Sequence, residues 1–353
     1  MDKDLSTPCV SVIMPVYNCR SFIKEAVESI LNQTYQDFEL FIIDDVSNDG
    51  TYELLQTMQD ARIKLIRKDK NTGYVDSLNM GLSLARGIYI ARMDGDDISV
   101  LTRFEHQIKI LDSDKSLGLC GTNYLTIDEH GTVGEHKAWS ENSTPLFWQL
   151  LWQNPIAHPS VMMRATILKQ HNLKYDKNKH PAEDYDLWCR LILYTKFHRT
   201  EESLLYYRVR INSEFNKNKE SAFKNGLGSL QELAKKLTGQ PFPPMHIQQN
   251  VFKAVYKNIK VSDPALYNKW LKKLIKLLLH DGFIEETDMP AIFKEVETKY
   301  NEQIKSYWYD NNKYSLNQLF KFYCSRERYV FKYHIPFQIR FIIKCVIAYS
   351  KAD

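Results

Sequence analysis

Apolar runs of strand length alternate with segments of helical periodicity through the first part of the chain. In the third helical segment, Val75, Leu78, Leu82 and Ala85 recur at a spacing of three or four residues. Continuous apolar strands separated by helices predict a parallel sheet covered by helices on both faces. The strands are expected at residues 10–14, 38–43, 63–66 and 88–93, and the helices between them at 21–32, 51–59 and 74–86.

Beyond residue 97 the pattern becomes mixed, and strands and helices no longer alternate regularly. The polar stretch 212–219 (NSEFNKNK) predicts a linker or loop, and the Lys- and Tyr-rich remainder is predicted to be mostly helical. In this middle part the helices are expected at about 102–111, 144–153 and 182–194, and the strands at 117–127, 159–164 and 204–208.

Polar clusters follow three of the predicted strands. They are PVYN (15–18), the pair Asp44–Asp45 and the stretch ARMDGDD (91–97), which holds three acids in four positions. In open parallel sheets ligands bind beyond the carboxyl ends of the strands. Closely spaced carboxylates without His or Cys suit a hard cation such as Mg²⁺ or Mn²⁺, and a diphosphate leaving group is the natural partner of that ion. The clusters therefore predict the functional site.

The turn after the first strand excludes two common nucleotide-binding classes. Residues 15–19 contain no glycine, which a dinucleotide-binding Rossmann turn needs, and the chain has no GxxxxGK[ST] motif of a P-loop. An isolated Asp-x-Asp is more often a solvated acidic turn. A second acidic strand end at residues 44–45 favours the functional interpretation here.

Composition and charge indicate a globular protein with two dissimilar parts. The chain has 353 residues, 44% of them hydrophobic and 25% charged, which is typical of a globular protein of about two domains. Residues 1–215 carry 24 Lys and Arg against 30 Asp and Glu, whereas residues 216–353 carry 23 against 13. The formal charges of −6 and +10 add to the +4 of the whole chain and indicate different roles for the two parts.

The cysteines and the start of the chain predict a cytoplasmic protein. The cysteines include no CxxC pair, which argues against a zinc site or a disulfide framework. Acids stand near the first residue where a signal peptide needs bases, and no apolar run reaches the ~20 residues of a membrane span. The cysteines are Cys9, Cys19, Cys120, Cys189, Cys324 and Cys345.

The last residues, 329–353, mix basic and apolar side chains. As a helix after Pro336, this segment would place Arg340 and Lys344 on one side and apolar residues opposite. A basic amphipathic helix can lie on an anionic membrane surface, and a core-facing helix with a solvated basic face is the equal alternative. No nucleic-acid-binding motif accompanies the charge, so no nucleic-acid partner is expected.

Five motifs together resemble the inverting glycosyltransferases of family 2, over roughly residues 8–210. They are PVYN (15–18), FELFIIDDVSNDGT (38–51), NTG (71–73), NMGLSLARGIYIARMDGDD (79–97) and AEDYDLWCRL (182–191), in the order and spacing of that family. The resemblance implies an α/β fold: a GT-A glycosyltransferase domain over 1–215 with a mainly parallel central sheet. A mostly α-helical, basic C-terminal region, 216–353, would follow it.

The implied activity is metal-dependent and inverting. One hexose or N-acetylhexosamine would pass from a nucleotide sugar to a hydroxyl of a lipid-linked or surface glycan. By the pattern of this family, the donor is expected to be a UDP-sugar. Processive members of the family carry a QxxRW-type motif with membrane helices, which this sequence does not show, so a single addition is expected. A sugar-phosphate nucleotidyltransferase and a non-catalytic glycan- or membrane-binding protein are the alternatives.

The resemblance also assigns roles on the donor side. Pro15, Tyr17 and Asn18 would take part in nucleotide-sugar binding, with Pro15 and Tyr17 lining the nucleobase pocket. Asp45 would accept a hydrogen bond from the imide nitrogen of uracil or thymine. For Asp44 the alternative is to cap the following turn.

The acids of ARMDGDD would hold the metal and the ribose. Asp96 matches the acid that contacts the ribose hydroxyls and helps to hold the ion, and Asp97 matches the principal metal ligand. Metal contact and structural support are open alternatives for Asp94. Arg92 is expected as a solvent-exposed strand arginine, although it could face the diphosphate.

The acceptor side rests on Glu183 and Asp184. An inverting transfer needs a base opposite the leaving group, and Asp184 occupies the family's position for it, with Glu183 as the second candidate. Capping of a helix is the alternative for both. His158 would lie beside donor and acceptor or be a structural histidine. Trp148 and Trp152 could stack on sugars, whereas Trp188 is expected in the core.

Overall fold

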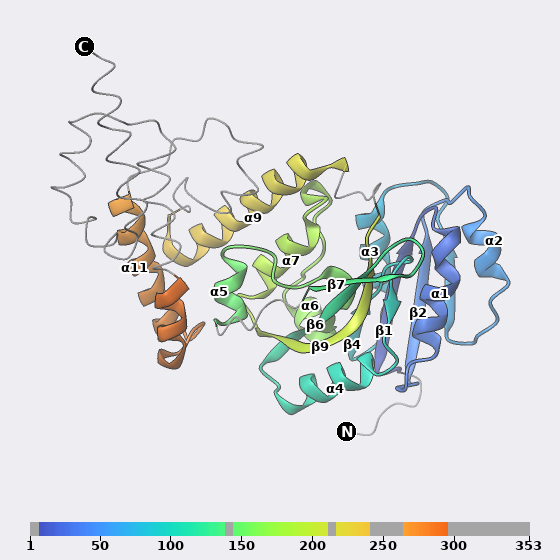
Figure 1. The fold of residues 1–353 in the computed structure, drawn as a ribbon, viewed down its shortest axis with the longest axis horizontal. Coiled ribbons are helices and arrows are strands. Elements are labelled where there is room, and N and C mark those ends of the chain that lie inside the picture. Colours follow the sequence, from blue (N-terminus) through green and yellow to red (C-terminus); the bar gives the residue numbers. More distant parts are fainter. Residues whose placement is uncertain (1–6, 138–143, 211–216, 241–263, 296–353) are drawn as a thin grey trace, which may run out of the picture. The chain divides into compact units, whose positions relative to one another are not determined.

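The structure is a computed structural model that describes residues 7–137, 144–210, 217–240 and 264–295 (Figure 1). The chain divides into two compact units, Met1–Leu233 and Ala234–Asp353. The first unit therefore runs past residue 215, and the functional assignment of the two expected domains stays a prediction.

The first unit contains a nine-stranded sheet. Its strands are β1 (Val10–Val16), β2 (Phe38–Asp44), β3 (Ile63–Arg67), β4 (Tyr89–Arg92), β5 (Ile98–Ser99), β6 (Leu117–Ile127), β7 (Val133–Lys137), β8 (Met162–Arg164) and β9 (Lys196–Arg208). Its helices are α1 (Arg20–Leu31), α2 (Thr51–Gln56), α3 (Tyr74–Leu84), α4 (Arg103–Ser113), α5 (Leu146–Leu150), α6 (Ala165–Gln170) and α7 (Glu183–Leu191), with short 3-10 turns η1 (His158–Ser160) and η2 (Lys177–Lys179). Helix α9 (Lys219–Thr238) begins in this unit.

The sheet has a parallel half and a mixed half. Its strand order is β3-β2-β1-β4-β8-β6-β9-β5, with β7 paired to β6. The first four strands are parallel, β8 is antiparallel to β4, and β9 runs parallel to β6. The expected GT-A-like α/β architecture with a mainly parallel central sheet is confirmed, and the carboxyl ends of β1, β2 and β4 open on the same edge.

Burial explains why the parallel half forms. Every residue of β1, β2 and β4 is buried, so these strands need apolar side chains on both faces. Helix α1 packs Ile23, Ala26, Val27 and Ile30 against this half of the sheet, as their spacing of three and four requires. The polar strand ends are consequently fixed by a rigid core.

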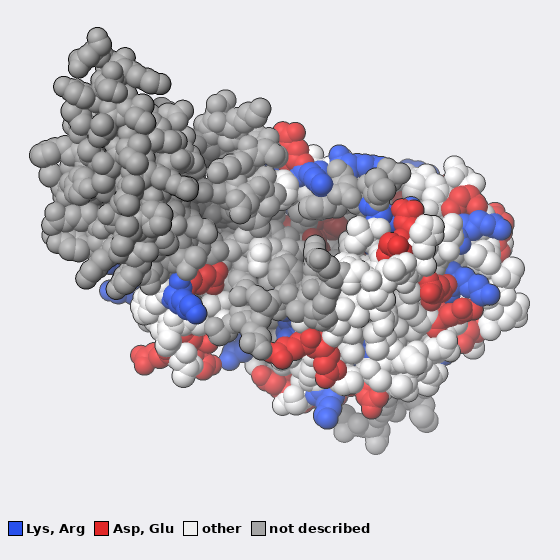
Figure 2. Space-filling model, viewed as in Figure 1, with Lys and Arg blue, Asp and Glu red and all other residues white. Residues whose placement is uncertain are grey.

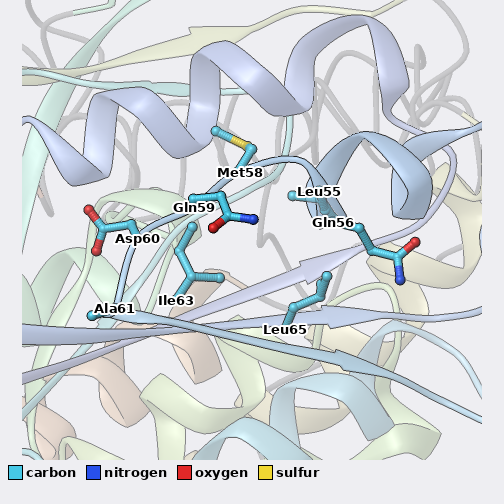
Figure 3. Close-up of a pocket in the computed structure, with 8 residues that line it drawn as sticks. All are labelled: Leu55, Gln56, Met58, Gln59, Asp60, Ala61, Ile63 and Leu65. Carbon is cyan, nitrogen blue, oxygen red and sulfur yellow. The ribbon is translucent and has the colours of Figure 1, made fainter.

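One short helix and the edge strand form a surface hollow that lies away from the predicted site residues. It is formed by α2, the loop after it and β3, and it is lined by Leu55, Gln56, Met58, Gln59, Asp60, Ala61, Ile63 and Leu65 (Figure 3). The carboxylate of Asp60 is already paired with Arg62 at 2.7 Å. None of the predicted site residues lines this hollow.

In the second unit the structure describes α11 (Pro264–His280) and the 3-10 turn η3 (Glu286–Asp288). Leu274, Ile275 and Leu278 on α11 are buried, whereas Lys272 and Lys276 are exposed. Within the described ranges, no helix combines the length and the apolar character that a membrane crossing needs. The amphipathic segment expected at 329–353 lies outside the described residues.

Charged side chains of both signs are interspersed over the visible face of the first unit (Figure 2). Four cysteines of the described part, Cys9, Cys19, Cys120 and Cys189, are buried. They take part in no disulfide.

The guanidinium of Arg103 joins α4 to the centre of the sheet. It is fully buried and donates to the main-chain carbonyls of Pro159 at 2.8 Å and Arg92 at 3.2 Å. Burial lowers its pKa to about 9, because the charged form is desolvated.

We expect Arg103→Met to lower the free energy of unfolding by about 2 kcal/mol or more, because two buried carbonyls lose their donors. Urea unfolding measures the change. Arg20→Met is the matched control, since Arg20 is exposed and donates to the Gly50 carbonyl at the surface. Equal losses in the two variants would contradict this role of Arg103.

Candidate active site

The loops after β1 and β2 are tied together by Asn18. Its backbone N–H donates to Ser47 Oγ at 3.0 Å, and its side-chain oxygen accepts from the Asn48 N–H at 2.9 Å. Asn18 has φ 49° and Val46 has φ 64°. A β-branched residue in the left-handed region costs about 1–3 kcal/mol and is found where the surroundings impose it, often at functional sites.

Asp45 holds the start of α3. Its carboxylate accepts the backbone N–H groups of Thr72 at 3.0 Å and Gly73 at 2.8 Å, and it pairs with Lys68 Nζ at 2.5 Å. Asp45 and Lys68 are almost fully buried. Gly73 has φ 95°, a conformation that favours glycine. Asp44 accepts from the Ser47 N–H and so caps the following turn, the alternative given above.

Three carboxylates meet just after β4. Asp94, Asp96 and Asp97 each offer an oxygen within 4.8 Å of the others. Asp97 is 1% exposed; its Oδ1 accepts the Arg208 N–H at 2.8 Å, whereas its Oδ2 is buried without a hydrogen-bond partner among the residues described. Burial, and then the charges of Asp94 and Asp96, raise the pKa of Asp97.

These acids fit a divalent cation. Carboxylate oxygens are the donors that Mg²⁺ and Mn²⁺ prefer, and the buried Asp97 Oδ2 provides an unused one. Desolvation raises the pKa of Asp94 to about 6, even though Arg92 lies beside it. The cluster is therefore short of positive charge, which a bound cation would supply.

Two arginines at the end of β9 contact the cluster. On β9, Arg208 Nε donates to the Asp96 carbonyl at 2.7 Å, and a second nitrogen pairs with Glu25 at 2.8 Å. Arg210 contacts Asp96 Oδ2 at 3.2 Å. The segment at the end of β9 thus fixes the loop that carries the acids.

The expectation that Arg92 is solvent-exposed is wrong. Arg92 is 3% exposed because β4 is a central strand with covered faces, and its guanidinium pairs with Asp94. Its Nε and one terminal nitrogen have no hydrogen-bond partner in the described part of the chain. Buried guanidinium donors of this kind can bind phosphate or hydroxyl oxygens of a ligand.

A chain of hydroxyls and an imidazole leads away from Asp94. The Tyr74 hydroxyl donates to Asp94 Oδ1 at 3.4 Å and lies 3.5 Å from His158 Nδ1, while His158 Nε2 lies 2.9 Å from the Tyr175 hydroxyl. Burial and then Arg92 hold the pKa of His158 well below its usual value, and burial raises that of Tyr175. Both groups are therefore neutral.

The directions of these hydrogen bonds follow from neutrality. A neutral imidazole has one donor and one acceptor nitrogen. Because the Tyr74 proton goes to Asp94, His158 Nδ1–H must donate to Tyr74, and Nε2 must accept from Tyr175. This assignment of the tautomer uses both nitrogens of His158 within the protein, and its place beside donor and acceptor stays a prediction.

The acid pair stands at the first turn of α7. Asp184 Oδ2 accepts from Asn154 Nδ2 at 2.7 Å and Oδ1 accepts the Tyr185 N–H at 2.7 Å. Burial, and then the neighbouring Glu183, raise the pKa of Asp184 to about 7. Glu183 is 6% exposed and its Oε2 lies 2.9 Å from His180 Nδ1.

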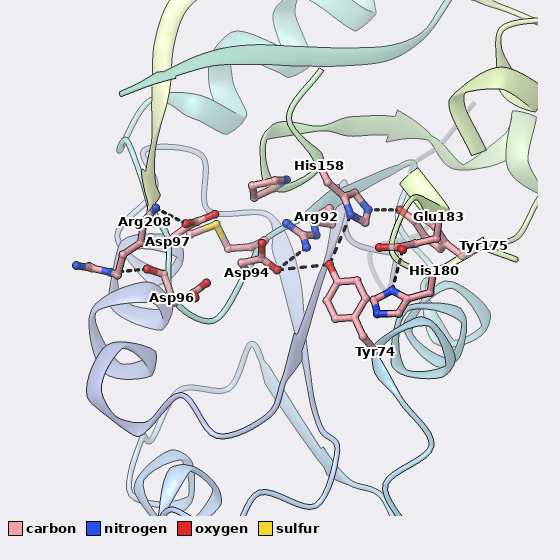
Figure 4. A network of polar contacts seen from close by, with 12 residues as sticks. Tyr74, Arg92, Asp94, Asp96, Asp97, His158, Tyr175, His180, Glu183 and Arg208 are labelled. Carbon is pink, nitrogen blue, oxygen red and sulfur yellow. Dashed lines mark hydrogen bonds and ion pairs between the residues drawn. The ribbon is translucent and has the colours of Figure 1, made fainter. Parts of the chain in front are cut away.

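The structure brings both predicted acid centres to one network. Figure 4 shows Asp96 and Asp97 at one end and Glu183 at the other, with Tyr74 and His158 between them. Between the acids after β4 and the acids of α7 lie the side chains of Tyr74, from α3, and His158, from η1.

Several residues of the network escaped the sequence analysis. Tyr74, Asn154, His180 and Arg208 lie outside the quoted acidic motifs, and only their neighbours could have drawn attention to them: Tyr74 follows Gly73, and Arg208 ends a predicted strand. Conversely, the tryptophans are core residues. Trp148 and Trp188 are fully buried, and Trp152 is 5% exposed. The expectation that Trp188 lies in the core is confirmed, and Trp148 and Trp152 have no exposed surface on which a sugar could stack.

Residues 11–171 match the family model "Glycosyl transferase family 2". The chain is 36% identical over 215 residues to an uncharacterized glycosyltransferase of Methanocaldococcus jannaschii, which covers 59% of this chain and 73% of that protein. It is 37% identical over 214 residues to the putative glycosyltransferase EpsE of Bacillus subtilis, covering 59% and 75%. It is 33% identical over 206 residues to the Escherichia coli UDP-Glc:alpha-D-GlcNAc-diphosphoundecaprenol beta-1,3-glucosyltransferase WfaP, covering 58% and 78%.

Solved structures share the fold at low identity. S. aureus TarS 1-349 in complex with UDP-GlcNAc superposes with a TM-score of 0.56 at 17% identity, over 84% of this chain and 91% of that one. The mannosyltransferase PcManGT from Pyrobaculum calidifontis, in complex with GDP-Man and Mn2+, gives 0.51 at 15% identity, over 97% and 88%. Sequence and fold agree: this chain belongs to glycosyltransferase family 2 and is a glycosyltransferase of the GT-A type.

Proposed function

We propose that the protein transfers a single hexose or N-acetylhexosamine, with inversion, from a UDP-sugar to a hydroxyl of a lipid-linked or surface glycan. WfaP, a relative at 33% identity, is named as an enzyme with a UDP-linked donor and a diphosphoundecaprenol-linked acceptor. TarS, a neighbour in fold, was solved with UDP-GlcNAc. Both support a UDP-sugar donor, and WfaP supports a lipid-linked acceptor.

The nucleobase would bind where β1 and β2 end. The ring of Tyr17 is 51% exposed there and can stack on a base, with Pro15 and Asn18 in the adjoining strand end and loop. An ionised carboxylate has about four acceptor positions, and Asp45 uses three of them within the protein. The remaining position suits the imide N–H of uracil.

The diphosphate and sugar would lie over β4. Asp96 and Asp97 would hold Mn²⁺ or Mg²⁺, with Asp94 beside them; the Arg208 N–H fixes Asp97 so that Oδ2 remains for the ion. Such an ion, when bound, supplies positive charge to the departing diphosphate. The buried N–H groups of Arg92 would donate to oxygens of the donor.

The acceptor hydroxyl would meet Asp184. An inverting transfer is one in-line displacement, in which the acceptor oxygen attacks the anomeric carbon from the side opposite the diphosphate and loses a proton to a base. The observation that carries the proposal is the state of Asp184. It has neutral hydrogen-bond donors, no ion-pair partner in the described chain and a pKa of about 7, across the network from the donor-side acids. A carboxylate in that state can accept a proton near neutral pH.

We expect Asp184→Asn to lower transfer at least a thousandfold while the dissociation constant for UDP stays within twofold. The amide keeps the shape of the side chain but cannot take the proton, and general bases contribute about 10²–10⁴-fold. Release of UDP from a UDP-sugar in the presence of acceptor measures transfer, and calorimetric titration measures binding. Asp114→Asn, on an exposed turn, is the control and should behave as wild type. Normal turnover in Asp184→Asn would refute the assignment.

We expect kcat/KM to fall about tenfold per pH unit below pH 7 and to level off above it, because only ionised Asp184 accepts the proton and its pKa is about 7. Removal of the neighbouring charge in Glu183→Gln should lower the pKa of Asp184 and move this limb to lower pH. Initial rates between pH 5.5 and 8.5 test both statements. A flat profile, or a shift of the limb to higher pH in Glu183→Gln, would speak against Asp184 as the base.

A further inference from the structure

Helix α9 lies beyond the residues that match the family model, and one of its faces contacts the segment that carries the acid pair. Asn225, Ser229 and Glu232 follow one another at spacings of four and three, so they lie on the same side of the helix. Figure 1 shows α9 alongside α7. All three residues belong to the first compact unit.

Each of these side chains has a partner near the start of α7. Asn225 Nδ2 donates to the His180 carbonyl at 2.7 Å. Ser229 Oγ donates to Asp186 Oδ1 at 2.9 Å. The carboxylate of Glu232 pairs with Lys179 Nζ at 2.8 Å. The contacts therefore bracket the acid pair, one set before it and one after it.

Helix α7 has no side-chain cap at its N-cap position, and in its first turn Asp184 itself accepts the Tyr185 N–H. Its N-cap residue is Ala182, which offers no acceptor to the free N–H groups of the helix. The segment before it is fixed instead through the His180 carbonyl, held by Asn225, while the His180 ring contacts Glu183 at 2.9 Å. Asn225 thus reaches the acid pair through one intervening residue.

The second tie fixes the opposite side of α7. Asp184 and Asp186 are two residues apart, about 200° around a helix, so one can face the site while the other faces α9. Asp186 is 2% exposed; its Oδ2 accepts from Arg190 at 2.7 Å and its Oδ1 from Ser229. Without the Ser229 hydroxyl, the partner that remains for Asp186 Oδ1 among the described residues is Lys179 Nζ, at 4.0 Å.

We propose that Asn225 and Ser229 are positioning residues of the transfer reaction: through the His180 carbonyl and Asp186 they fix the first turn of α7, and so the place of Asp184 at the acceptor hydroxyl. This inference rests on the proposed role of Asp184 as the base. It gives the residues after the last strand a part in the chemistry.

The effect should appear in turnover and not in donor binding. Misplacement of a reacting group by about 1 Å can cost about a hundredfold in rate. The donor-side acids lie at the ends of β2 and β4 and are held by Thr72, Gly73 and Arg208, none of which is on α9. A variant of α9 should therefore leave UDP binding intact.

The test compares Asn225→Ala and Ser229→Ala with Ser221→Ala in the full-length protein. Ser221 is an exposed serine one turn before Asn225 on the same helix, so the third variant makes the same Ser-to-Ala change at a side chain that is not buried. For each, kcat and the KM for the UDP-sugar come from initial rates, the dissociation constant for UDP from calorimetry, and the melting temperature from a thermal scan. Asp184→Asn is measured alongside.

We expect kcat to fall at least tenfold in Asn225→Ala and in Ser229→Ala, with donor KM and UDP binding within twofold of wild type and Ser221→Ala unchanged. Unchanged kcat in both variants, beside an inactive Asp184→Asn, would overturn the positioning role alone. Loss of UDP binding in step with kcat would overturn it too, since it would show a general loss of structure. An active Asp184→Asn would instead remove the proposed function and this inference with it.

Discussion

Repulsion among the carboxylates at the end of β4 is the constraint on which the rest of the site depends. Asp94, Asp96 and Asp97 lie within a few ångströms of one another, and burial strengthens their mutual repulsion. Three arginines stabilise these acids: Arg92 on β4 pairs with Asp94, and at the end of β9 the Arg208 N–H donates to Asp97 while Arg210 pairs with Asp96. The contacts from the end of β9 mean that the acidic site is complete only when β9 has joined the sheet.

The two chemical ends of the site are connected by neutral groups. Tyr175 donates to His158, His158 donates to Tyr74 and Tyr74 donates to Asp94, so these hydrogen bonds run from the segment before α7 to the acids after β4. Neutral donors and acceptors can orient a ligand between two acidic centres without adding a charge of their own. The acids after β4 carry a deficit of positive charge, and Asp184 is a carboxylate with a raised pKa. In the proposed function, the first state favours departure of the diphosphate and the second favours removal of the acceptor proton.

Local patterns predicted the part of the fold that is built from local signals. The four parallel strands and their helices lie within a few residues of the expected bounds. Continuous apolar runs indicate buried strands, and a spacing of three or four residues between apolar positions indicates amphipathic helices. The short strands β5 and β7 and the first half of β9 were not predicted. Residues 196–203 of β9 include exposed and half-buried polar side chains, and long-range pairing with β6 makes them a strand.

The site residues also divide into those that local sequence patterns predict and those that depend on long-range contacts. The acids at strand and helix ends were predicted because their place in the chain sets their place in the fold, and the comparisons confirm the glycosyltransferase interpretation over the nucleotidyltransferase one. Arg92 was placed wrongly: the predicted cover on both faces of the sheet implies a buried side chain at this position, whereas an arginine is by residue type expected at the surface. Arg208, Asn154 and His180 act across long sequence separations or through turns, so only the folded chain reveals them. The individual roles of the acids remain predictions.

The measurement that tests the account most directly is calorimetric titration of UDP, GDP and dTDP, each with Mn²⁺ and with EDTA. We expect UDP to bind in the presence of Mn²⁺ and to lose most of its affinity in EDTA, and we expect Asp97→Asn to lose this metal dependence. Asp184→Asn should bind UDP as wild type does, because Asp184 lies at the acceptor end of the network. Absence of binding by every nucleotide, or binding of UDP that EDTA leaves unchanged, would contradict a metal-assisted donor site at the end of β4.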